Sequence, residues 1–152
     1  KLISNDAMDL SLLITDNLNL DTTSVPMEIY ARADLLYYQN KFEESIITLD
    51  SICVLYSGHT LLDEIYYRKY QIYNKKGEID KAIGMLEVII SDYPYDILKD
   101  DALFYLAQLY EIKKKDSKKA IYYYEAILLE CNGSIYTSES RKKYRQLRGD
   151  QL

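Results

Sequence analysis

The sequence contains few of the residues that interrupt helices. Its 152 residues include two prolines and five glycines. Proline removes a backbone donor and glycine costs conformational entropy inside a helix, so few of either favours helices joined by short connections. With 48% apolar and 28% charged residues, the composition is typical of a globular domain. We therefore expect an all-α chain.

Residues that carry chemistry are equally scarce. The sequence has one histidine, His59, and two cysteines, Cys53 and Cys131, which have no metal-ligand spacing. Both cysteines lie among apolar residues, which favours free buried thiols; a disulfide between them is the alternative. There is no glycine-rich phosphate loop and no pattern that brings two carboxylates together for acid–base work. We expect no cofactor, no metal and no catalytic residue, so the protein is not expected to be an enzyme.

Excess positive charge and long apolar runs are also lacking. The net charge is −5, whereas general binding to nucleic acid needs a basic surface. No apolar run approaches the ~20 residues that a helix needs to span a bilayer. Neither nucleic-acid binding nor membrane insertion is therefore expected.

What the sequence does contain is a repeat. Ala33, Tyr70 and Ala107 lie 37 residues apart, within the similar stretches 29–58, 66–95 and 103–133. A second series has spacings of 37 and then 38 and consists of Ser45, Ala82 and Ala120. A fixed period of this size indicates stacked supersecondary units.

Each repeat divides into two helical patterns. A short polar break, "QNKF", "KKGEI" or "KKKDS", separates two segments whose apolar residues recur at three- and four-residue spacing. The small residues of the two series are expected where paired helices approach closely. Each unit is therefore predicted to be an antiparallel helix pair.

Residues suited to helix ends support these boundaries. Pro26 suits a first helical turn, and Gly58 and Gly133 follow predicted helix ends, where a left-handed conformation is expected. Asp116 and Thr137 are predicted N-caps.

The repeats resemble the tetratricopeptide repeat. The second unit carries the motif at Tyr66, Tyr73, Ala82, Leu86 and Pro94, and the third at Leu103, Leu106, Ala107, Tyr110, Ala120 and Tyr124. The first unit matches less well, through Ile29, Ala33, Leu36, Ser45 and Leu49. The period is longer than usual, and Tyr70 occupies a position for a small residue, so packing there must differ. The resemblance implies a right-handed α-solenoid whose first helices line the concave surface.

The whole chain is also similar to the C-terminal region of tetratricopeptide repeat proteins from Bacteroidetes-type bacteria. "SDYP" and "GSIYTSES" are similar to segments of bacterial envelope repeat proteins such as lipoprotein scaffolds of outer-membrane barrel assembly. This similarity favours the periplasm or cell envelope over the cytoplasm. Neither group has catalytic residues to transfer to this sequence.

The flanking segments complete a predicted array of about eight helices. Residues 5–18 are expected to be the second helix of a truncated repeat, which implies a longer parent array. Repeats are predicted at 26–57, 60–95 and 97–133, and a cationic capping helix at 137–148. The cations of that helix either face solvent or dock on acidic groups of a partner or of the array itself. A homodimer through helix 5–18 would make the chain a structural module, the alternative to a binding scaffold.

Three consecutive tyrosines, 122–124, test the helical prediction. Successive helical residues point about 100° apart. We expect Tyr124 in the core, Tyr123 aimed at the next helix and Tyr122 more exposed.

The candidate binding residues recur on the first helix of each repeat. The period predicts an aromatic row, Tyr30, Tyr67 and Phe104, beside a polar row, Asp34, Gln71 and Gln108, with Tyr37, Asn74 and Glu111 three residues further on. Aromatic anchors in polar surroundings concentrate binding energy at interfaces. The sequence thus predicts a non-catalytic scaffold that binds a peptide or protein segment on this face. The alternatives are that the aromatic side chains pack against neighbouring first helices, or that the groove is used only in the full-length array.

Overall fold

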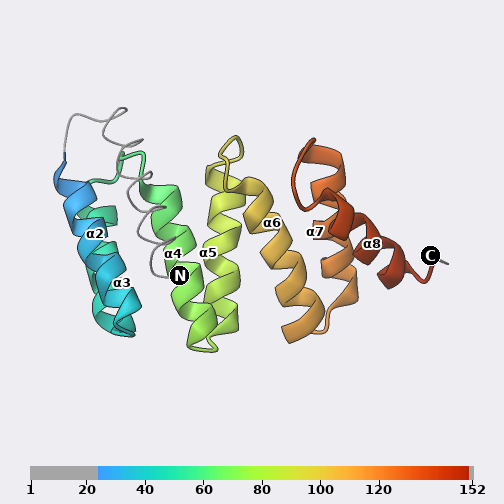
Figure 1. Ribbon diagram of the computed structural model, residues 1–152, viewed down its shortest axis with the longest axis horizontal. Coiled ribbons are helices and arrows are strands. Elements are labelled where there is room, and N and C mark those ends of the chain that lie inside the picture. Colours follow the sequence, from blue (N-terminus) through green and yellow to red (C-terminus); the bar gives the residue numbers. More distant parts are fainter. Residues whose placement is uncertain (1–23, 151–152) are drawn as a thin grey trace. The chain divides into compact units, whose positions relative to one another are not determined.

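The computed structural model describes residues 24–150, and within them the chain is helical without a strand. The elements are α2 (Val25–Tyr38), α3 (Phe42–Leu55), α4 (Leu62–Lys75), α5 (Ile79–Asp92), α6 (Lys99–Gln108), the π-helical turn η1 (Leu109–Lys113), α7 (Ser117–Glu130) and α8 (Thr137–Arg148) (Figure 1). The all-α solenoid-like prediction is confirmed, and right-handedness stays a prediction. The expected helix at 5–18, and the dimer through it, lie outside the described residues.

The chain divides into two compact units, residues 1–65 and 66–152. In the first, α2 packs against α3 with Ala33 and Ser45 fully buried at the contact. The Ser45 hydroxyl donates to the Ala33 carbonyl oxygen at 2.7 Å. The predicted close approach of small residues is confirmed, and the hydrogen bond satisfies a polar group that burial would otherwise penalise.

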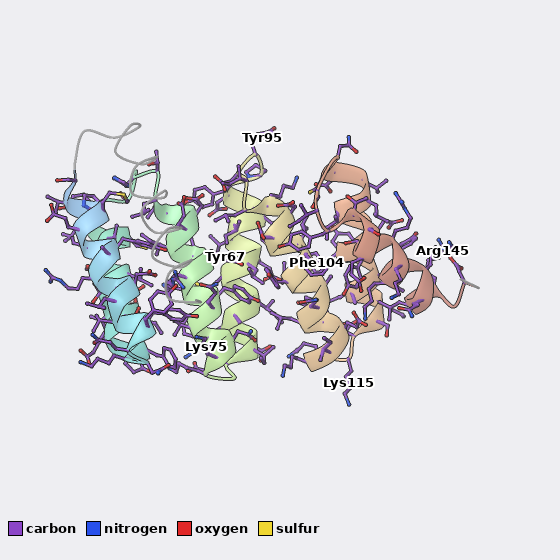
Figure 2. The ribbon with its side chains drawn as sticks, in the orientation of Figure 1. Tyr67, Lys75, Tyr95, Phe104, Lys115 and Arg145 are labelled. Carbon is purple, nitrogen blue, oxygen red and sulfur yellow. The ribbon has the colours of Figure 1, made fainter. Side chains whose placement is uncertain are left out.

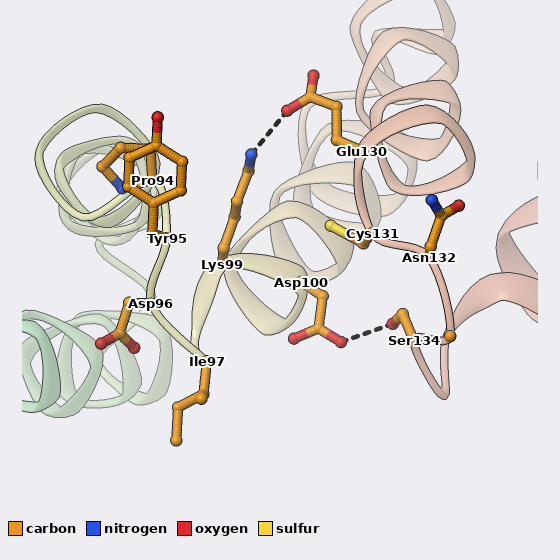
Figure 3. A pocket seen from close by; sticks show the side chains of 11 residues that line it. Pro94, Tyr95, Asp96, Ile97, Lys99, Asp100, Glu130, Cys131, Asn132 and Ser134 are labelled. Carbon is orange, nitrogen blue, oxygen red and sulfur yellow. Dashed lines mark hydrogen bonds and ion pairs between the residues drawn. The ribbon is translucent and has the colours of Figure 1, made fainter.

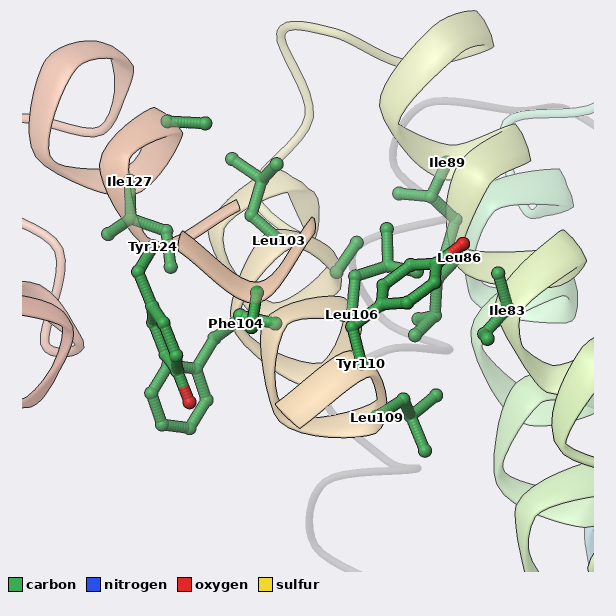
Figure 4. Packing of buried hydrophobic residues seen from close by; sticks show 14 of the residues in the cluster. Ile83, Leu86, Ile89, Leu103, Phe104, Leu106, Leu109, Tyr110, Tyr124 and Ile127 are labelled. Carbon is green, nitrogen blue, oxygen red and sulfur yellow. The ribbon is translucent and has the colours of Figure 1, made fainter. Parts of the chain in front are cut away.

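The second unit is a row of antiparallel helices in chain order, from the α4 residues beyond 65 to α8 (Figure 1). One continuous core runs through α5, α6 and α7, and Figure 4 shows Leu86, Leu106 and Ile127 within it. Tyr70, at the expected small-residue position, is buried and its ring lies 5.6 Å from Tyr67 and 5.7 Å from Tyr105. Packing at Tyr70 is therefore aromatic, as its departure from the motif requires.

A recurring turn joins the two helices of each pair. Asn40, Gly77 and Lys115 have φ values of 59°, 75° and 54°, and each lies two residues before the next helix. A left-handed residue just past a helix end lets later N–H groups satisfy its last carbonyls. Of the three, the glycine adopts this conformation at least steric cost.

The third helix pair has one additional residue, which lies before this turn. The N–H that follows the left-handed residue bonds a carbonyl five residues back in the first two turns, Lys41 to Leu36 and Glu78 to Tyr73. In the third turn the bond from Asp116 to Tyr110 spans six residues, at 2.8 Å. The additional residue lies in the π-helical segment η1. The spacing of 38 therefore results from a π-helical insertion.

Most predicted helix ends are confirmed. Pro26 lies in the first turn of α2, Gly133 has a φ of 83°, and the Asp116 side chain accepts a hydrogen bond from the Lys119 N–H at 3.1 Å. Two predictions are wrong, at Gly58 and Thr137.

Gly58 lacks a positive φ because a side chain, not a left-handed glycine, organises its turn. The His59 imidazole Nδ1 accepts from the Leu61 N–H at 3.1 Å. Thr137 is the first residue of α8, whose N-cap is Tyr136. The Thr137 hydroxyl instead donates to the Ser134 carbonyl at 2.9 Å.

Candidate functional site

The candidate residues of the first unit are buried. Tyr30, Asp34 and Tyr37 on α2 are 4%, 1% and 6% exposed. The Tyr37 ring also lies 5.1 Å from Tyr38 and 6.1 Å from Phe42. In the first unit these aromatic side chains therefore serve packing, the alternative that the sequence left open.

Phe104 of the second unit is also buried, at 8% exposure. Tyr136, just before α8, stacks on it with ring centroids 4.3 Å apart and planes inclined by 14°. The spacing of the repeats gave no sign of this cover, because Tyr136 lies outside the repeated pattern. Phe104 thus anchors the segment before α8 to α6 by offset aromatic packing.

Tyr67, labelled in Figure 2, is half-buried. It belongs to an aromatic cluster that includes residues outside the predicted aromatic row. Its ring lies 6.3 Å from Tyr105 on the neighbouring first helix, and Tyr105 lies 6.2 Å from Tyr136. Burial raises the pKa values of the Tyr67 and Tyr136 hydroxyls further above neutral pH, at which a tyrosine is already protonated. They can therefore donate hydrogen bonds.

One carboxylate is held within this cluster. The Tyr136 hydroxyl donates to Asp101 Oδ1 at 2.5 Å. Burial raises the pKa of Asp101, an effect that the Tyr136 hydrogen bond opposes and neighbouring Asp100 reinforces. Tyr105, Tyr136 and Asp101 were not among the predicted site residues, although Tyr105 is adjacent to Phe104 in the sequence.

The polar positions of the second unit remain accessible. Asn74 is exposed, and Gln71, Gln108 and Glu111 are half-buried. The Gln71 side-chain oxygen accepts from an Arg68 guanidinium N–H at 2.8 Å. These groups lie on α4, α6 and η1, so polar side chains flank the Tyr67–Tyr105 pair on consecutive first helices.

Glu111 is the most connected of these groups. Its carboxylate accepts from the buried Tyr124 hydroxyl at 2.7 Å and pairs with the Lys143 ammonium at 2.8 Å. One cation of α8 thus docks on an acidic group of the array, as one of the sequence alternatives predicted. Arg141, Lys142 and Arg145 of the same helix are exposed.

The chemistry available in the described residues is that of binding. Phenolic hydroxyls, amides and aromatic faces can contact a polypeptide, since amides both donate and accept. Residues 24–150 contain no group of three or more histidine, cysteine, aspartate or glutamate side chains placed to hold a metal ion. Among the described helices, none has the length and apolar character to cross a membrane.

Both cysteines are free and partly buried, which confirms the free-thiol prediction. Burial raises the pKa of the Cys131 thiol above its ordinary value. A less ionised thiol is a weaker nucleophile, so Cys131 behaves as a small packing residue.

Comparison with known families matches the tetratricopeptide repeat model to residues 71–94 and 101–130. The first match covers most of the α4–α5 pair, and the second covers α6, η1 and α7. No match was found among curated proteins. Tetratricopeptide repeats generally mediate protein–protein interactions, typically as non-catalytic scaffolds. Since both matched segments fold as the helix pairs that the repeat requires, the chain is a tetratricopeptide repeat protein.

Proposed function

We propose that this protein is a non-catalytic scaffold that binds a peptide or protein segment on a first-helix face of its second unit. We define this face by Tyr67, Gln71 and Asn74 on α4, and by Tyr105, Gln108 and Glu111 on α6 and η1. The proposal rests on unit 2, because the corresponding α2 positions of the first unit are buried.

The observation that supports the proposal best is the contact between Tyr67 and Tyr105. Their rings lie 6.3 Å apart on consecutive first helices, and both are half-buried rather than sealed in the core. Half-buried tyrosines provide apolar area with little rotamer entropy to lose, which suits a binding hot spot.

The polar groups beside this pair suit an extended chain. Gln71 and Gln108 each offer an amide donor and acceptor, which can bond the N–H and C=O groups of a bound backbone. Glu111 is held by Tyr124 and Lys143, so little ordering is needed when a partner binds.

The proposal is tested by photo-crosslinking in the cell that makes the protein. A photoreactive amino acid replaces Gln71 or Gln108 and, as the control, Tyr122, which is 65% exposed on second helix α7. We expect a discrete heavier adduct from the first two positions and none from the third. Adducts from Tyr122 alone would contradict the proposal.

The affinity of the cross-linked partner provides a second readout. Tyr67→Ala should weaken binding about tenfold, since aromatic hot spots contribute of this order. Tyr122→Ala is the matched control and should leave the affinity unchanged. Equal affinity of both variants for the partner would exclude the Tyr67–Tyr105 pair as its anchor.

A further inference from the structure

The second unit has a hollow of about 630 Å³ that lies away from Gln108 and Glu111. The α5–α6 connection and the α7–α8 connection form it, and Figure 3 shows Tyr95, Ile97 and Lys99 on one side of it. Lys99 begins α6, whereas Gln108 ends the same helix. The hollow and the amide of Gln108 therefore lie toward opposite ends of α6, and a volume of this size is in the range of ligand pockets.

Two side-chain contacts connect the two sides of the hollow. The Lys99 ammonium pairs with Glu130 Oε2 at 2.7 Å, and the Ser134 hydroxyl donates to Asp100 Oδ2 at 2.6 Å (Figure 3). Both contacts join the start of α6 to the end of α7 or the loop after it. A surface that is already ordered loses less entropy when a partner binds.

Large apolar side chains lie in the open on both loops. Tyr95 and Ile97, which line the hollow, are 99% and 84% exposed. Ile135, next to the lining residue Ser134, is 85% exposed. A single exposed apolar side chain needs no explanation, but three on neighbouring loops beside a hollow mark a contact surface.

The charges of the lining indicate what this surface contacts. Three carboxylates, Asp96, Asp100 and Glu130, lie there with one cation, Lys99. At the other ends of α6 and α7, the turn before α7 contains Lys114 and Lys115, and Lys115 is labelled in Figure 2. A cationic segment is therefore attracted to the hollow and repelled from this opposite turn.

We propose that this hollow, together with Tyr95, Ile97 and Ile135, is a second docking surface for a short protein segment that combines lysine or arginine with aliphatic or aromatic side chains. The apolar residues of the segment cover the exposed loop side chains, and its cations face the carboxylates. The surface is separate from the first-helix face and does not depend on the function proposed there.

The test uses the full chain and three fluorescein-labelled nonapeptides. In the first, lysine and arginine alternate with leucine and phenylalanine; the second has glutamate in place of the cations, and the third serine in place of the apolar residues. Fluorescence anisotropy should detect binding of the first peptide only. Its affinity should fall as salt is raised, because part of the attraction is between solvent-exposed charges.

The docking surface is tested by a pair of loop substitutions with a matched control. Tyr95→Ala with Ile97→Ala should weaken binding of the first peptide about tenfold. Tyr122→Ala with Ile112→Ala removes a tyrosine and an isoleucine that are 65% and 58% exposed elsewhere in the unit, and should leave binding unchanged. All four side chains are exposed, so unchanged thermal melting of both variants confirms that they are folded.

Four outcomes would overturn the proposal. The first would be that the glutamate peptide binds as tightly as the cationic one, and the second that the loop substitutions leave binding unchanged. The third would be that Tyr67→Ala, rather than the pair of loop substitutions, abolishes binding, which would place the peptide on the first-helix face. The fourth would be that sedimentation shows a dimer that the two loop substitutions dissociate, which would make a second copy of the chain the occupant.

Discussion

At the residue scale, the three consecutive tyrosines divide between core and surface as helical geometry predicts. Tyr124 is fully buried and Tyr122 is 65% exposed, as predicted. Tyr123 was expected to face the next helix, but this prediction is wrong: its ring stacks on Tyr110 of the preceding η1, with centroids 5.6 Å apart. Burial, with a contribution from Glu87, raises the pKa of Tyr123 to about 12. An angular step of about 100° per residue was enough to separate core from surface, but not to say which neighbouring helix Tyr123 contacts.

These tyrosines give the first prediction. Tyr124→Ala should lower the free energy of unfolding by about 3–5 kcal/mol, because it leaves a large cavity. Tyr124→Phe should cost about 1 kcal/mol through the lost hydrogen bond to Glu111. Tyr122→Ala should change stability by less than about 0.5 kcal/mol. Urea denaturation measures all three, and a Tyr122→Ala cost equal to that of Tyr124→Ala would refute the assignment.

Asp101 gives a prediction of pH dependence. Its pKa in the folded state lies above the ordinary 3.8, so the native state holds this proton over a range where the unfolded state has lost it. The stability that Asp101 provides relative to Asp101→Asn is therefore greatest at acidic pH and falls as pH rises through that range.

Urea denaturation of wild type and Asp101→Asn between about pH 3 and pH 7 measures this difference. The amide that replaces the carboxyl keeps an oxygen that can accept from Tyr136, so the comparison isolates the charge. A difference that grows with pH would show that the folded carboxyl has a lowered pKa instead.

The accessibility of individual candidates could not be predicted from the repeat. The period places Tyr67 and Phe104 at equivalent positions, but Tyr136 covers only Phe104. That cover comes from the segment before α8, whose position depends on tertiary packing rather than on the period. The repeat therefore predicts which face a residue occupies, not what lies over it.

At the element scale, the third helix pair shows how the array absorbs an extra residue. The spacing of 38 was visible in the sequence, but its location was not, because a longer turn or a bulge in the helix would give the same count. The structure places it in η1 and keeps the left-handed residue two positions before α7. The turn is thus preserved and the helix is altered.

A deletion tests this reading of η1. Ile112 is 58% exposed within the π-helical turn, and its removal should convert the turn to an α-helix at a cost below about 2 kcal/mol. Deleting Leu106, in α6, should rotate the residues before or after it by about 100° and disrupt the core. Circular dichroism with thermal melting compares them, and equal damage from both deletions would contradict an insertion in η1.

The contact between α2 and α3 gives a prediction at the same scale. Ser45→Ala removes the hydrogen bond to Ala33 and should cost about 1 kcal/mol. Ser45→Val also adds volume where the helices are closest and should cost about 1–3 kcal/mol more. Urea denaturation measures both, and a valine variant as stable as wild type would show that the helices can separate without loss.

At the scale of the whole molecule, the period and the spacing of small residues were sufficient to predict paired helices. The family match agrees with the second and third repeats, at residues 71–94 and 101–130. The division into two compact units within α4 could not be predicted from the sequence, because the pattern of an uninterrupted amphipathic helix does not indicate where one unit ends. The hollow between loops was also not predicted, since loop residues lie outside the helical period.

The measurement that tests the proposed scaffold most directly is hydrogen–deuterium exchange with and without the partner recovered by cross-linking at Gln71 or Gln108. Binding on the first-helix face should slow exchange in residues 66–75 and 105–113, with α5 and α7 little changed. Slowed exchange confined to α5 and α7 would contradict the proposal, because the partner would then lie on the second helices.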